Sequence, residues 1–535
     1  MKIVTAAEMR EIDRLTAEKY GVPSLTLMEN AGSAVASFVL QHHPRAQRVV
    51  AVCGKGNNGG DGLVAARKLH ESEKSVTVVL LARTNEVKGD AKQMLAKLPF
   101  APMIAASPQE LRKCEELIGK ADVILDAVFG TGFHPPLPGL AASVIELIDQ
   151  SSAPVISVDI PSGADADSFE VTQLHACRSN GIVTFTAPKA GVIFSTLTRG
   201  PIAVASIGSP DEAITSDLNL EWNAPPAILR KDRQLNSNKG LYGHALIIGG
   251  SLGKSGAPTM ASMAALRIGA GLVTAAIPKS VLPIVAGAIP ELMTEPLDEN
   301  DGGSISEQAL DEPECKKLLA GKNVVALGPG IGRDPDTVES IRNFVARCSL
   351  PLVLDADGLN AFEGAAHLLD GHKHPLVLTP HPGEMARLIG KSVAEVESHR
   401  LEVAREVARK HHAIVVLKGW RTLIAVPDGQ VWVNTTGNPG LAKGGSGDVL
   451  TGMIAGMMAQ FPGRTIEAAD AVRAAVYLHG LAADLAAAQA DERTLLATDV
   501  IRHLSDAQRS ARTAPHGLTT IQRDLQSTSS SGECR

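Results

Sequence analysis

Residues 438–452 read NPGLAKGGSGDVLTG, and this stretch decides the fold of the C-terminal half. Three of its glycines, Gly444, Gly445 and Gly447, stand directly before a helical run of mostly apolar residues. A glycine-rich turn at a helix start presents backbone N–H groups to an anion, which the helix dipole also attracts. Asp448 falls in the first turn, where the dipole favours a carboxylate even without a catalytic role. Beside a bound phosphate, Asp448 becomes a candidate general base that activates a hydroxyl.

The rest of the C-terminal half alternates short apolar strands with helices. The strands are rich in Val, Ile and Leu, and helices rich in Ala and Gly are predicted over Pro258–Gly269 and Asp448–Ala459. This alternation predicts a mainly parallel sheet with helices on both faces. The predicted strands are 245–248, 272–276, 324–327, 352–354, 376–378, 414–417 and 431–434.

The N-terminal half shows the same alternation and predicts a second α/β domain. Its expected strands are 49–53, 76–81, 123–125, 155–158 and 182–185, with a helix over Gly62–His70. Between Ser209 and Pro226 the chain carries Pro, Asp and Asn without a clear period, which places the domain boundary there. We therefore expect domains over 1–219 and 220–507. The polar, Ser/Thr-rich remainder, 508–535, is expected to be disordered.

The bulk properties are those of an ordinary globular protein and exclude several classes. Of the 535 residues, 44% are hydrophobic and 20% are charged. The formal net charge of −7 argues against a general nucleic-acid binder, which would carry a basic surface. The N-terminus, MKIVTAAEMREIDRL, lacks the apolar segment of a signal peptide, and no apolar run is long enough to span a membrane. The six cysteines form no CxxC pair, so we expect a cytoplasmic protein, assembled as a homo-oligomer.

Polar residues follow three of the predicted N-terminal strands. The first strand runs into GKGNNGGDG (54–62), whose glycines let backbone N–H groups approach a ligand, although the pattern is not GxGxxG. Asp126 and Asp159 follow two later strands. Each aspartate alone could merely cap a turn, but ligands bind beyond the carboxyl ends of strands in open α/β sheets. Three polar strand ends together favour a site, and Asn58, Asp126 and Ser162 could coordinate a hard cation.

Strand ends in the C-terminal half offer a comparable set of groups. GPGIG (328–332) and DADGLN (355–360) follow two predicted strands. TPHPGE (379–384) follows a third and places His381 between two prolines, a setting that favours a cleft over a structural role. KGWRT (418–422) follows a fourth and offers a cation, an amide and a hydroxyl to phosphates, although a single lysine there is usually only solvated.

The segments CGKGNNGGDGLVAARKL, LDAVFGTGF and SVDIPSG, in this order, resemble the N-terminal epimerase domain of the bifunctional NAD(P)H-hydrate repair enzymes. The resemblance spans about residues 1–215. It implies a Rossmann-like domain that interconverts the R and S forms of hydrated NADH and NADPH, with Asp159 as the acid–base group. It also implies potassium held by Asn58, Asp126 and Ser162. Besides Asp159, the residues implied to hold the hydrated nucleotide are Asn57, Asn58, Gly59, Gly60, Asp61, Gly130, Thr131, Gly132, Phe133, His134, Pro135 and Pro136.

The segments NKGLYGHALIIGGS, GPGIG, DADGLN, TPHPGE, KGWRT and GGSGDVLTG resemble the ribokinase-like superfamily, in detail its ADP- or ATP-dependent NAD(P)H-hydrate dehydratase branch. The usual GTGD loop is GSGD here, which keeps a hydroxyl. The resemblance implies phosphoryl transfer to the ring hydroxyl of the S hydrate, followed by loss of phosphate to restore the nicotinamide double bond.

Bacterial members of this branch typically use ADP, which implies release of AMP and phosphate, with magnesium bridging the phosphates. Asp448 is the implied catalytic base. The implied contacts to the hydrated nucleotide are Ala257, Gly330, His381 and Asp448. The implied contacts to the adenine nucleotide are Lys418, Gly419, Trp420, Arg421, Thr422 and Gly447.

Two alternative interpretations stay open at the level of the sequence. A ribokinase-like small-molecule kinase would need the same base and the same glycine turn, and only the HPGE and DADGLN segments favour the dehydratase, by resemblance. The N-terminal half could instead be a non-catalytic nucleotide-binding module. Its NNGGD segment, Asp126 and Asp159 argue against that interpretation.

Overall fold

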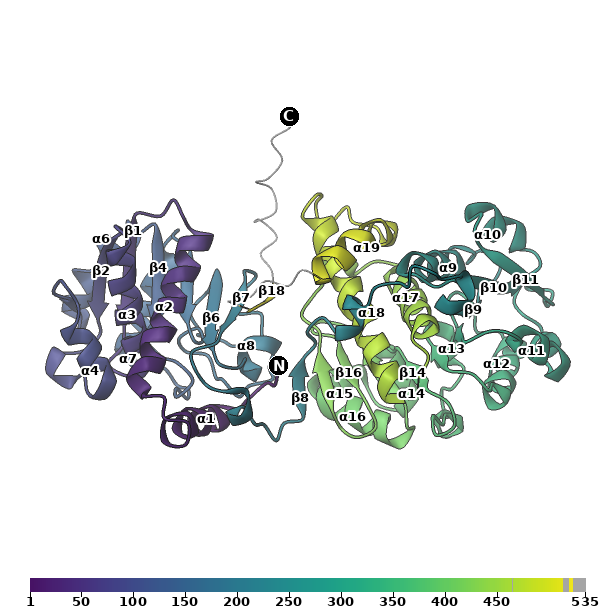
Figure 1. Cartoon of the computed structure of the whole chain (residues 1–535), viewed down its shortest axis with the longest axis horizontal. Helices are drawn as coiled ribbons and strands as arrows, with labels where there is room; N and C mark the ends of the chain where they lie inside the picture. The colour runs from purple at the N-terminus through teal and green to yellow at the C-terminus, as the bar shows by residue number, and fades with distance from the viewer. Residues whose placement is uncertain (464, 513–518, 523–535) are drawn as a thin grey trace, which may run out of the picture. The chain divides into compact units, whose positions relative to one another are not determined.

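The computed structural model describes residues 1–463, 465–512 and 519–522 (Figure 1). The chain forms two compact units. The first contains Met1–Leu218 together with the strand β18 (Thr519–Gln522), and the second begins at Asn219. Each unit is built on one sheet of its own.

The sheet of the first unit has the strand order β18-β7-β6-β5-β4-β1-β2-β3. All neighbours are parallel except β18 and β7. Its strands, besides β18, are β1 (Arg48–Cys53), β2 (Ser75–Leu80), β3 (Met103–Ile104), β4 (Val123–Ala127), β5 (Val155–Val158), β6 (Gly181–Phe185) and β7 (Ile202–Ala205). Its helices are α1 (Ala6–Glu18), α2 (Ser24–His42), α3 (Asn57–Glu71), α4 (Gly89–Ala96), α5 (Pro108–Arg112), α6 (Glu115–Gly119), α7 (Gly139–Gln150) and α8 (Ala190–Phe194).

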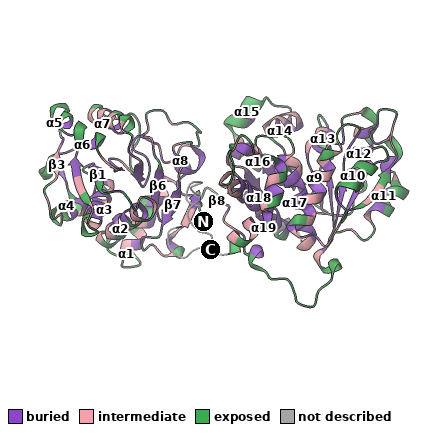
Figure 2. Ribbon diagram, turned by 90° about the horizontal axis from the view of Figure 1, so that it is seen from above, coloured by how far each residue is buried: buried purple, intermediate pink, exposed green. Residues whose placement is uncertain are grey.

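The central strand β1 contributes side chains to two apolar cores, one on each face of the sheet. Val49, Ala51 and Cys53 belong to the core beneath α2, α3 and α4, whereas Val50 and Val52 belong to the core beneath α5, α6 and α7. Figure 2 shows the buried strands between these two helical layers. Because successive side chains of a strand point to opposite faces, a strand covered on both sides must be apolar throughout. This explains the uninterrupted run VVAVC.

The strand order reverses between β1 and β4, because β2 and β3 follow on one side and β5, β6 and β7 on the other. The connections after β1 and β4 therefore leave in opposite directions, and the crevice between them is the usual ligand site of such sheets. Gly54 allows the two connections to touch, since a Cβ there would lie 2.2 Å from the carbonyl oxygen of Val128. A larger residue at position 54 would push the strand ends apart.

The sheet of the second unit has the order β11-β10-β9-β12-β13-β14-β15-β16-β17-β8, and only β15–β16 and β16–β17 are antiparallel pairs. Its strands are β8 (Leu220–Trp222), β9 (His244–Ile248), β10 (Leu272–Pro278), β11 (Met293–Leu297), β12 (Val324–Leu327), β13 (Leu352–Leu354), β14 (Leu376–Leu378), β15 (Ile414–Leu417), β16 (Leu423–Ala425) and β17 (Val431–Val433). Its helices are α9 (Gly256–Ile268), α10 (Leu282–Ala288), α11 (Glu312–Leu319), α12 (Pro335–Arg347), α13 (Ala356–Asn360), α14 (Pro382–Ile389), α15 (Val393–Ser398), α16 (Arg400–Lys410), α17 (Ser446–Gln460), α18 (Thr465–Ala487) and α19 (Ala497–Arg512).

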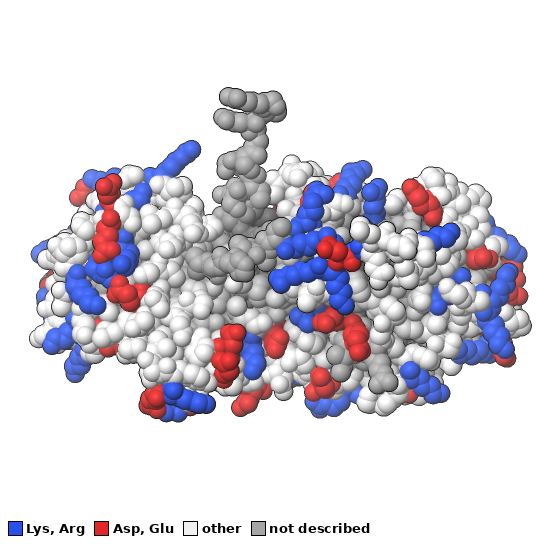
Figure 3. All heavy atoms as spheres, viewed as in Figure 1, with Lys and Arg blue, Asp and Glu red and all other residues white. Residues whose placement is uncertain are grey.

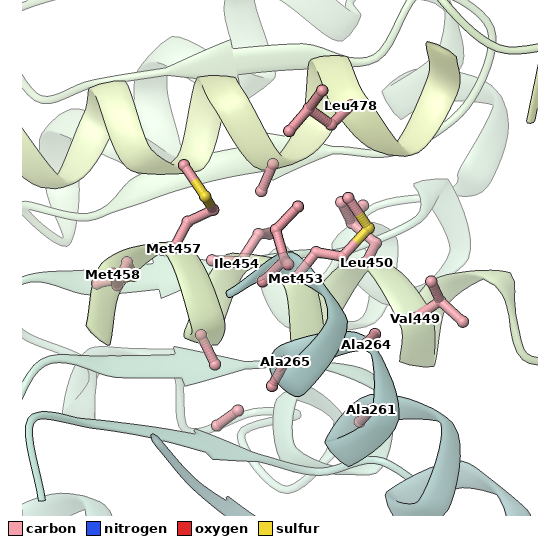
Figure 4. Packing of buried hydrophobic residues seen from close by; sticks show 14 of the residues in the cluster. Ala261, Ala264, Ala265, Val449, Leu450, Met453, Ile454, Met457, Met458 and Leu478 are labelled. Carbon is pink, nitrogen blue, oxygen red and sulfur yellow. The ribbon is translucent and has the colours of Figure 1, made fainter. Parts of the chain in front are cut away.

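The helices α9, α17, α18 and α19 share one apolar core with the strands of the second unit. Figure 4 shows α17 packed between α9 and α18, with small residues of α9 against the larger side chains of α17. Ala261, Ala264 and Ala265 are fully buried there, as are Met453 and Ile454. The close approach of α9 fixes the start of α17. The strand order of this unit also reverses once, between β9 and β12.

The structure confirms the predicted fold class, two α/β units with mainly parallel sheets, and contains each predicted strand with ends shifted by up to two residues. Several strands were not predicted, among them β3, β8 and β16, which have two or three residues each. The edge strand β8 lies inside the irregular segment 209–226 and pairs with β17. Its three residues are too few to show the alternation of apolar and polar side chains that predicts a strand.

The expected disorder of 508–535 is wrong for two described segments. α19 continues to Arg512, and β18 pairs antiparallel with β7. Ile521 is 3% exposed, so burial of one apolar side chain and pairing along the β7 edge order a segment that is otherwise polar. Residues 513–518 and 523–535 lie outside the described residues.

On the face of each unit turned to the viewer, Figure 3 shows acidic and basic side chains interspersed with uncharged surface. Among the helices of the described residues, none has both the length and the apolar character that a membrane crossing requires.

Replacement of Gly452 should destabilise the second unit. A Cβ at this position of α17 would lie 1.9 Å from the carbonyl oxygen of Ala261 in α9, so Gly452→Ala should lower the free energy of unfolding by about 1–3 kcal/mol. Urea unfolding of the full chain measures this. The matched control is Gly287→Ala in α10, where a Cβ meets nothing within 4 Å and alanine is the better helix former. Equal effects of the two substitutions would contradict the close packing of α9 on α17.

Candidate active sites

A cavity of about 640 Å³ lies at the switch point of the first unit. The turn after β1, the loop after β4 and the helix α1 all contribute to its wall. Of the residues predicted to hold the hydrated nucleotide, those that line it are Asn57, Asn58, Asp61, Gly130, Thr131, Gly132, Phe133, His134 and Asp159. Gly59, Gly60, Pro135 and Pro136 are not among the described lining residues.

Asp159 forms a buried ion pair with Lys189 in this cavity. The Lys189 Nζ lies 2.8 Å from Asp159 Oδ1 and donates further hydrogen bonds to the Thr184 hydroxyl at 3.0 Å and the Phe185 carbonyl at 3.1 Å. The other carboxylate oxygen of Asp159 accepts bonds from the backbone N–H of Thr131, at 3.0 Å, and from its hydroxyl. Burial opposes ionisation of Asp159, but Lys189 and Thr131 outweigh it and lower the pKa. Asp159 is therefore held as a carboxylate.

The backbone of Asp159 is in the left-handed region, with φ of 68°, which is uncommon for a residue with a side chain. Such conformations concentrate at functional sites, where the surroundings enforce them. Here the backbone N–H of Asp159 donates to the carbonyl of Val183 on β6 at 2.8 Å. This turn directs the carboxylate into the cavity that it lines.

The three predicted potassium ligands lie around the loop after β4. Asp126 is fully buried and accepts hydrogen bonds from the hydroxyl of Ser162 and, at 2.8 Å, from its backbone N–H. The Ser162 hydroxyl also lies 3.3 Å from the Phe129 carbonyl oxygen. Next along the loop, a Cβ on Gly130 would lie 3.1 Å from the carboxamide of Asn58. Both polar atoms of that carboxamide are buried, and neither has a hydrogen-bond partner among the described residues.

This donor set fits an oxygen-bound cation, because the orphaned Asn58 carbonyl requires a partner and carboxylate, hydroxyl and backbone oxygens are close by. Among the described residues, no group of three or more His, Cys, Asp or Glu side chains could hold a metal ion. A cation site here would therefore combine the single carboxylate of Asp126 with amide, hydroxyl and backbone oxygens.

Lys189 and Asp13 are among the lining residues of the cavity that were not predicted from the sequence. Lys189 follows β6 much as the predicted residues follow their strands, so its position after a strand was a usable signal. Asp13 lies on α1 and also lines the cavity, but nothing in its local sequence distinguishes it from other polar residues of an amphipathic helix.

The second candidate site surrounds the start of α17. Gly445 is the N-cap residue, with φ of 92°, and Asp448 is the third residue of the helix. The N–H groups of a first helical turn have no acceptor within the helix, so the 444–447 turn can bind a phosphate. Burial and then the charge of Asp355 raise the pKa of Asp448 to about 6, while Lys418 opposes them. Asp448 is therefore suited to accept a proton near neutral pH.

Lys418 pairs with a carboxylate at the centre of this site. Its Nζ lies 2.7 Å from Asp355 Oδ1 and 3.6 Å from Glu384 Oε2. The Asp355 carboxylate also accepts hydrogen bonds from the hydroxyls of Thr379, at 2.8 Å, and Thr451, at 2.7 Å. Burial disfavours the charge of Lys418, but Asp355 and Glu384 outweigh it and raise the pKa. The DADGLN, HPGE and KGWRT segments thus meet in one charged cluster.

His381 begins α14 and faces the same cluster. Its Nδ1 accepts the backbone N–H of Gly383 at 3.0 Å, and its Nε2 lies 3.4 Å from Glu384 Oε1. Burial lowers the pKa of His381, against the opposing charge of Glu384. With Nδ1 as an acceptor, the neutral imidazole carries its proton on Nε2 and can donate it to a ligand.

Ala257 and Gly330 meet at the second switch point, since a Cβ on Gly330 would lie 2.9 Å from that of Ala257. Asp357 adjoins them and accepts the backbone N–H of Gly332 at 3.2 Å and the Nε–H of Arg333 at 3.1 Å. The predicted contacts to the hydrated nucleotide therefore come from the loop after β12 and from the starts of α9, α14 and α17.

The KGWRT segment was predicted to offer a cation, an amide and a hydroxyl to phosphates, and the structure shows where its side chains lie. Lys418 turns inward to Asp355. The Arg421 guanidinium is buried, lies 4.2 Å from the Trp420 ring and donates to the Thr435 carbonyl at 3.2 Å. The Thr422 hydroxyl donates to the carbonyl of Gly419 at 3.1 Å. Of these side chains, the indole of Trp420 is the exposed one, so contact of this segment with a nucleotide stays a prediction.

Comparison with known proteins matches both units. A family model described as NAD(P)H-hydrate dehydratase matches residues 245–506, and one described as YjeF-related protein N-terminus matches residues 24–191. The bifunctional NAD(P)H-hydrate repair enzyme Nnr of Moorella thermoacetica is 42% identical over 517 residues, covering 94% of this chain and 96% of its own. The enzyme of the same name from Thermofilum pendens is 38% identical over 516 residues, covering 96% of this chain and 97% of its own.

A solved structure of an ADP/ATP-dependent NAD(P)H-hydrate dehydratase from Bacillus subtilis, co-crystallised with ATP and Mg²⁺, is 33% identical. It covers 55% of this chain and 99% of its own, with a TM-score of 0.47.

The two switch-point sites, each with a lysine paired to a buried aspartate, define a bifunctional α/β enzyme. With the identities above, the chain belongs to the family of bifunctional NAD(P)H-hydrate repair enzymes. Its N-terminal unit is the epimerase domain and its C-terminal unit the dehydratase domain of that family.

Removal of the Lys418 charge should destabilise the second unit, because it leaves Asp355 buried and unpaired. Lys418→Gln should lower the free energy of unfolding by about 3–5 kcal/mol, as measured by urea unfolding. Lys279→Gln, which opens the exposed Lys279–Asp298 pair, is the control and should leave stability unchanged. The double variant Lys418→Gln, Asp355→Asn should recover part of the loss. Equal stability of Lys418→Gln and the control would refute a paired, buried Asp355.

Proposed function

We propose that the two units act in succession on hydrated NADH and NADPH. The N-terminal unit equilibrates the R and S hydrates, and the C-terminal unit dehydrates the S form with consumption of ADP, releasing AMP and phosphate. Family membership favours this reaction over the alternatives of a small-molecule kinase and of a non-catalytic N-terminal module. The observation that carries the proposal is Asp448, a carboxyl of raised pKa in the first turn of α17, beside a glycine turn that can hold phosphate.

Dehydration begins with phosphoryl transfer to the ring hydroxyl. Asp448 accepts the hydroxyl proton as the hydroxyl oxygen attacks the terminal phosphorus of ADP and the bond to AMP breaks. The backbone N–H groups of the 444–447 turn stabilise the charge on the transferred group. The phosphate ester then cleaves at the carbon–oxygen bond, and loss of a proton from the adjacent carbon restores the double bond. Phosphate leaves readily where hydroxide does not.

Lys418 positions the other groups of this site. Paired with Asp355 and Glu384, it fixes the strand ends that carry them and limits the charge repulsion on Asp448. His381, at the start of α14, and the contact between Ala257 and Gly330 are assigned to the hydrated nucleotide. The residues assigned to the adenine nucleotide are Lys418, Gly419, Trp420, Arg421, Thr422 and Gly447.

In the epimerase unit, Asp159 is the acid–base residue that faces the reacting ring, and Lys189 keeps it ionised. The cavity walls from Asn57 to Asp61 and from Gly130 to His134 hold the nucleotide. Asn58, Asp126 and Ser162 are suited to hold potassium, which would satisfy the buried Asn58 carboxamide and order the loop after β4.

Magnesium is assigned to the dehydratase reaction, where it would bridge the phosphates of ADP and neutralise developing charge. The preference for ADP over ATP is part of the proposal. We further propose a cytoplasmic enzyme that works as a homo-oligomer, in keeping with cysteines that lack any paired motif.

Asp448→Asn should abolish dehydration and leave epimerisation intact. Incubation with mixed NADH hydrate epimers, ADP and magnesium, followed by the return of NADH absorbance, measures the first activity. In the unsubstituted chain, the dehydration rate should fall as pH drops through about 6, because protonation of Asp448 removes the base. Chromatography of the epimers without ADP measures the second activity. Absence of recovery with either ADP or ATP in the unsubstituted chain would refute the dehydratase proposal.

Asp159→Asn should limit NADH recovery to the S fraction of the mixture, apart from slow spontaneous exchange of the epimers. The substitution removes the carboxylate that Lys189 holds ionised, so the R form is no longer converted. Asp448→Asn serves as the reciprocal control, since each substitution should leave the other unit active in the same chain. Complete and fast recovery with Asp159→Asn would contradict the role of this residue.

A further inference from the structure

The epimerase cavity contains more carboxyl groups than Lys189 can pair. Asp13, Asp61, Asp90 and Asp159 all line it, and Lys189 makes its ion pair with Asp159. The reaction needs two acid–base groups, because the hydroxyls of the two epimers project from opposite faces of the ring. Asp159 supplies one of them in the proposed function. The other must come from a different wall of the same cavity.

Asp13 is placed at this cavity by the N-terminal segment. Val4 pairs with Lys189 in a parallel bridge, and its N–H donates to the Pro188 carbonyl at 3.0 Å. The Thr5–Glu8 capping box then begins α1, which runs along the cavity. The chain is thus tethered at Lys189 itself, and Asp13 lies about two helical turns further on.

The Asp13 side chain has the features of an uncommitted acid. Its Oδ1 is buried and has no hydrogen-bond partner among the described residues. A buried carboxyl oxygen without a partner is costly unless a ligand satisfies it. Burial and the charge of Asp159 raise the pKa of Asp13 to about 6, with Lys189 opposing them. The charged and titratable side chains that line the cavity around it are Arg10, Lys55, Asp61, Asp90, His134, Asp159 and Lys189.

We propose that Asp13 is a second catalytic acid–base residue of the epimerase, acting on the face of the nicotinamide ring opposite Asp159. This inference rests on the proposed epimerase site, and it adds a residue that lies outside the 24–191 family match. An acid and a base in one site are usually two carboxyls whose surroundings shift their pKa values in opposite directions.

The step balances in protons and electrons. Asp13 donates its proton to the ring hydroxyl as the carbon–oxygen bond breaks, and the lone pair of the ring nitrogen forms a carbon–nitrogen double bond. Water then adds to the same carbon from the other face, and its proton passes to Asp159. The reverse reaction exchanges the two roles. Solvent restores the starting protonation of both carboxyls between turnovers.

Asp61 is the competing candidate for this role. It lies on α3 beside the same groups, and burial together with the charges of Asp159 and Asp13 raises its pKa well above the ordinary value. A carboxyl held protonated in this way is suited to donate a hydrogen bond to the substrate. Asp13 has the pKa nearer neutrality and is therefore better matched to cyclic proton transfer.

Asp13→Asn in the full chain tests the inference. The R hydrate of NADH is incubated without ADP, and its conversion to the S form is followed by chromatography. The substitution should slow conversion by about 10²–10⁴-fold, the usual contribution of one acid–base group. Glu11→Gln, on the exposed side of the same helix, is the control and should convert at the unsubstituted rate. Addition of ADP should show S-form dehydration unchanged in both variants, which reports an intact second unit.

The pH dependence separates a catalytic from a structural role. In the unsubstituted chain, the rate of epimerisation should fall as pH rises above about 6, because Asp13 must be protonated to act as the acid. Asp13→Glu should retain this alkaline limb of the pH–rate profile. Asp13→Asn should abolish this limb with an unchanged melting temperature. A chain with Asp13→Asn that converts at the normal rate overturns the inference, as does loss of the limb in Asp61→Asn alone. If the unsubstituted chain converts nothing, the epimerase proposal itself fails.

Discussion

The reversal of strand order at the centre of each sheet is the constraint on which both sites depend. In the first unit the connections diverge after β1 and β4, and in the second after β9 and β12. No crossover helix can cover the crevice between diverging connections, so glycine turns and polar side chains line it instead. The apolar interior of the strands and the polar character of their ends are two consequences of one topology. Helices on both faces keep those ends in register.

Each crevice uses a lysine paired with a buried aspartate in the same way. Lys189 is bound by Asp159, and Lys418 by Asp355. In each case a further carboxyl nearby, Asp13 or Asp448, has no ion pair of its own among the described residues. Burial and the charge of the paired aspartate together raise the pKa of that second carboxyl to about 6. In each site the paired aspartate therefore stays ionised, and the second carboxyl can exchange a proton near neutral pH.

The sequence predicts the strands well where the run is apolar and long enough to be covered on both faces, as with VVAVC in β1. It also predicts that Asp126, Asp159 and His381 lie at sites, because carboxyl ends of parallel strands share one edge, and that Asp448 does, because a glycine turn precedes its helix. It cannot predict Asp13, since only the tertiary bridge between Val4 and Lys189 brings α1 to the cavity. Nor can it show that Lys418 turns inward, because that depends on Asp355, which lies 63 residues away in the chain.

The two reactions differ in the fate of the hydroxyl, and the two sites differ accordingly. Epimerisation returns the hydroxyl to the same carbon, so proton transfer between carboxyls on two faces of the ring is sufficient. Dehydration in water must make the departure of the hydroxyl irreversible, which requires conversion to a better leaving group. This explains why the glycine turn before α17 is suited to phosphate binding, while the NNGGD turn after β1 contributes amides to a cavity beside a candidate cation site. One sheet topology thus supports acid–base exchange in one unit and phosphoryl transfer in the other, and the difference lies in a few residues at the strand ends.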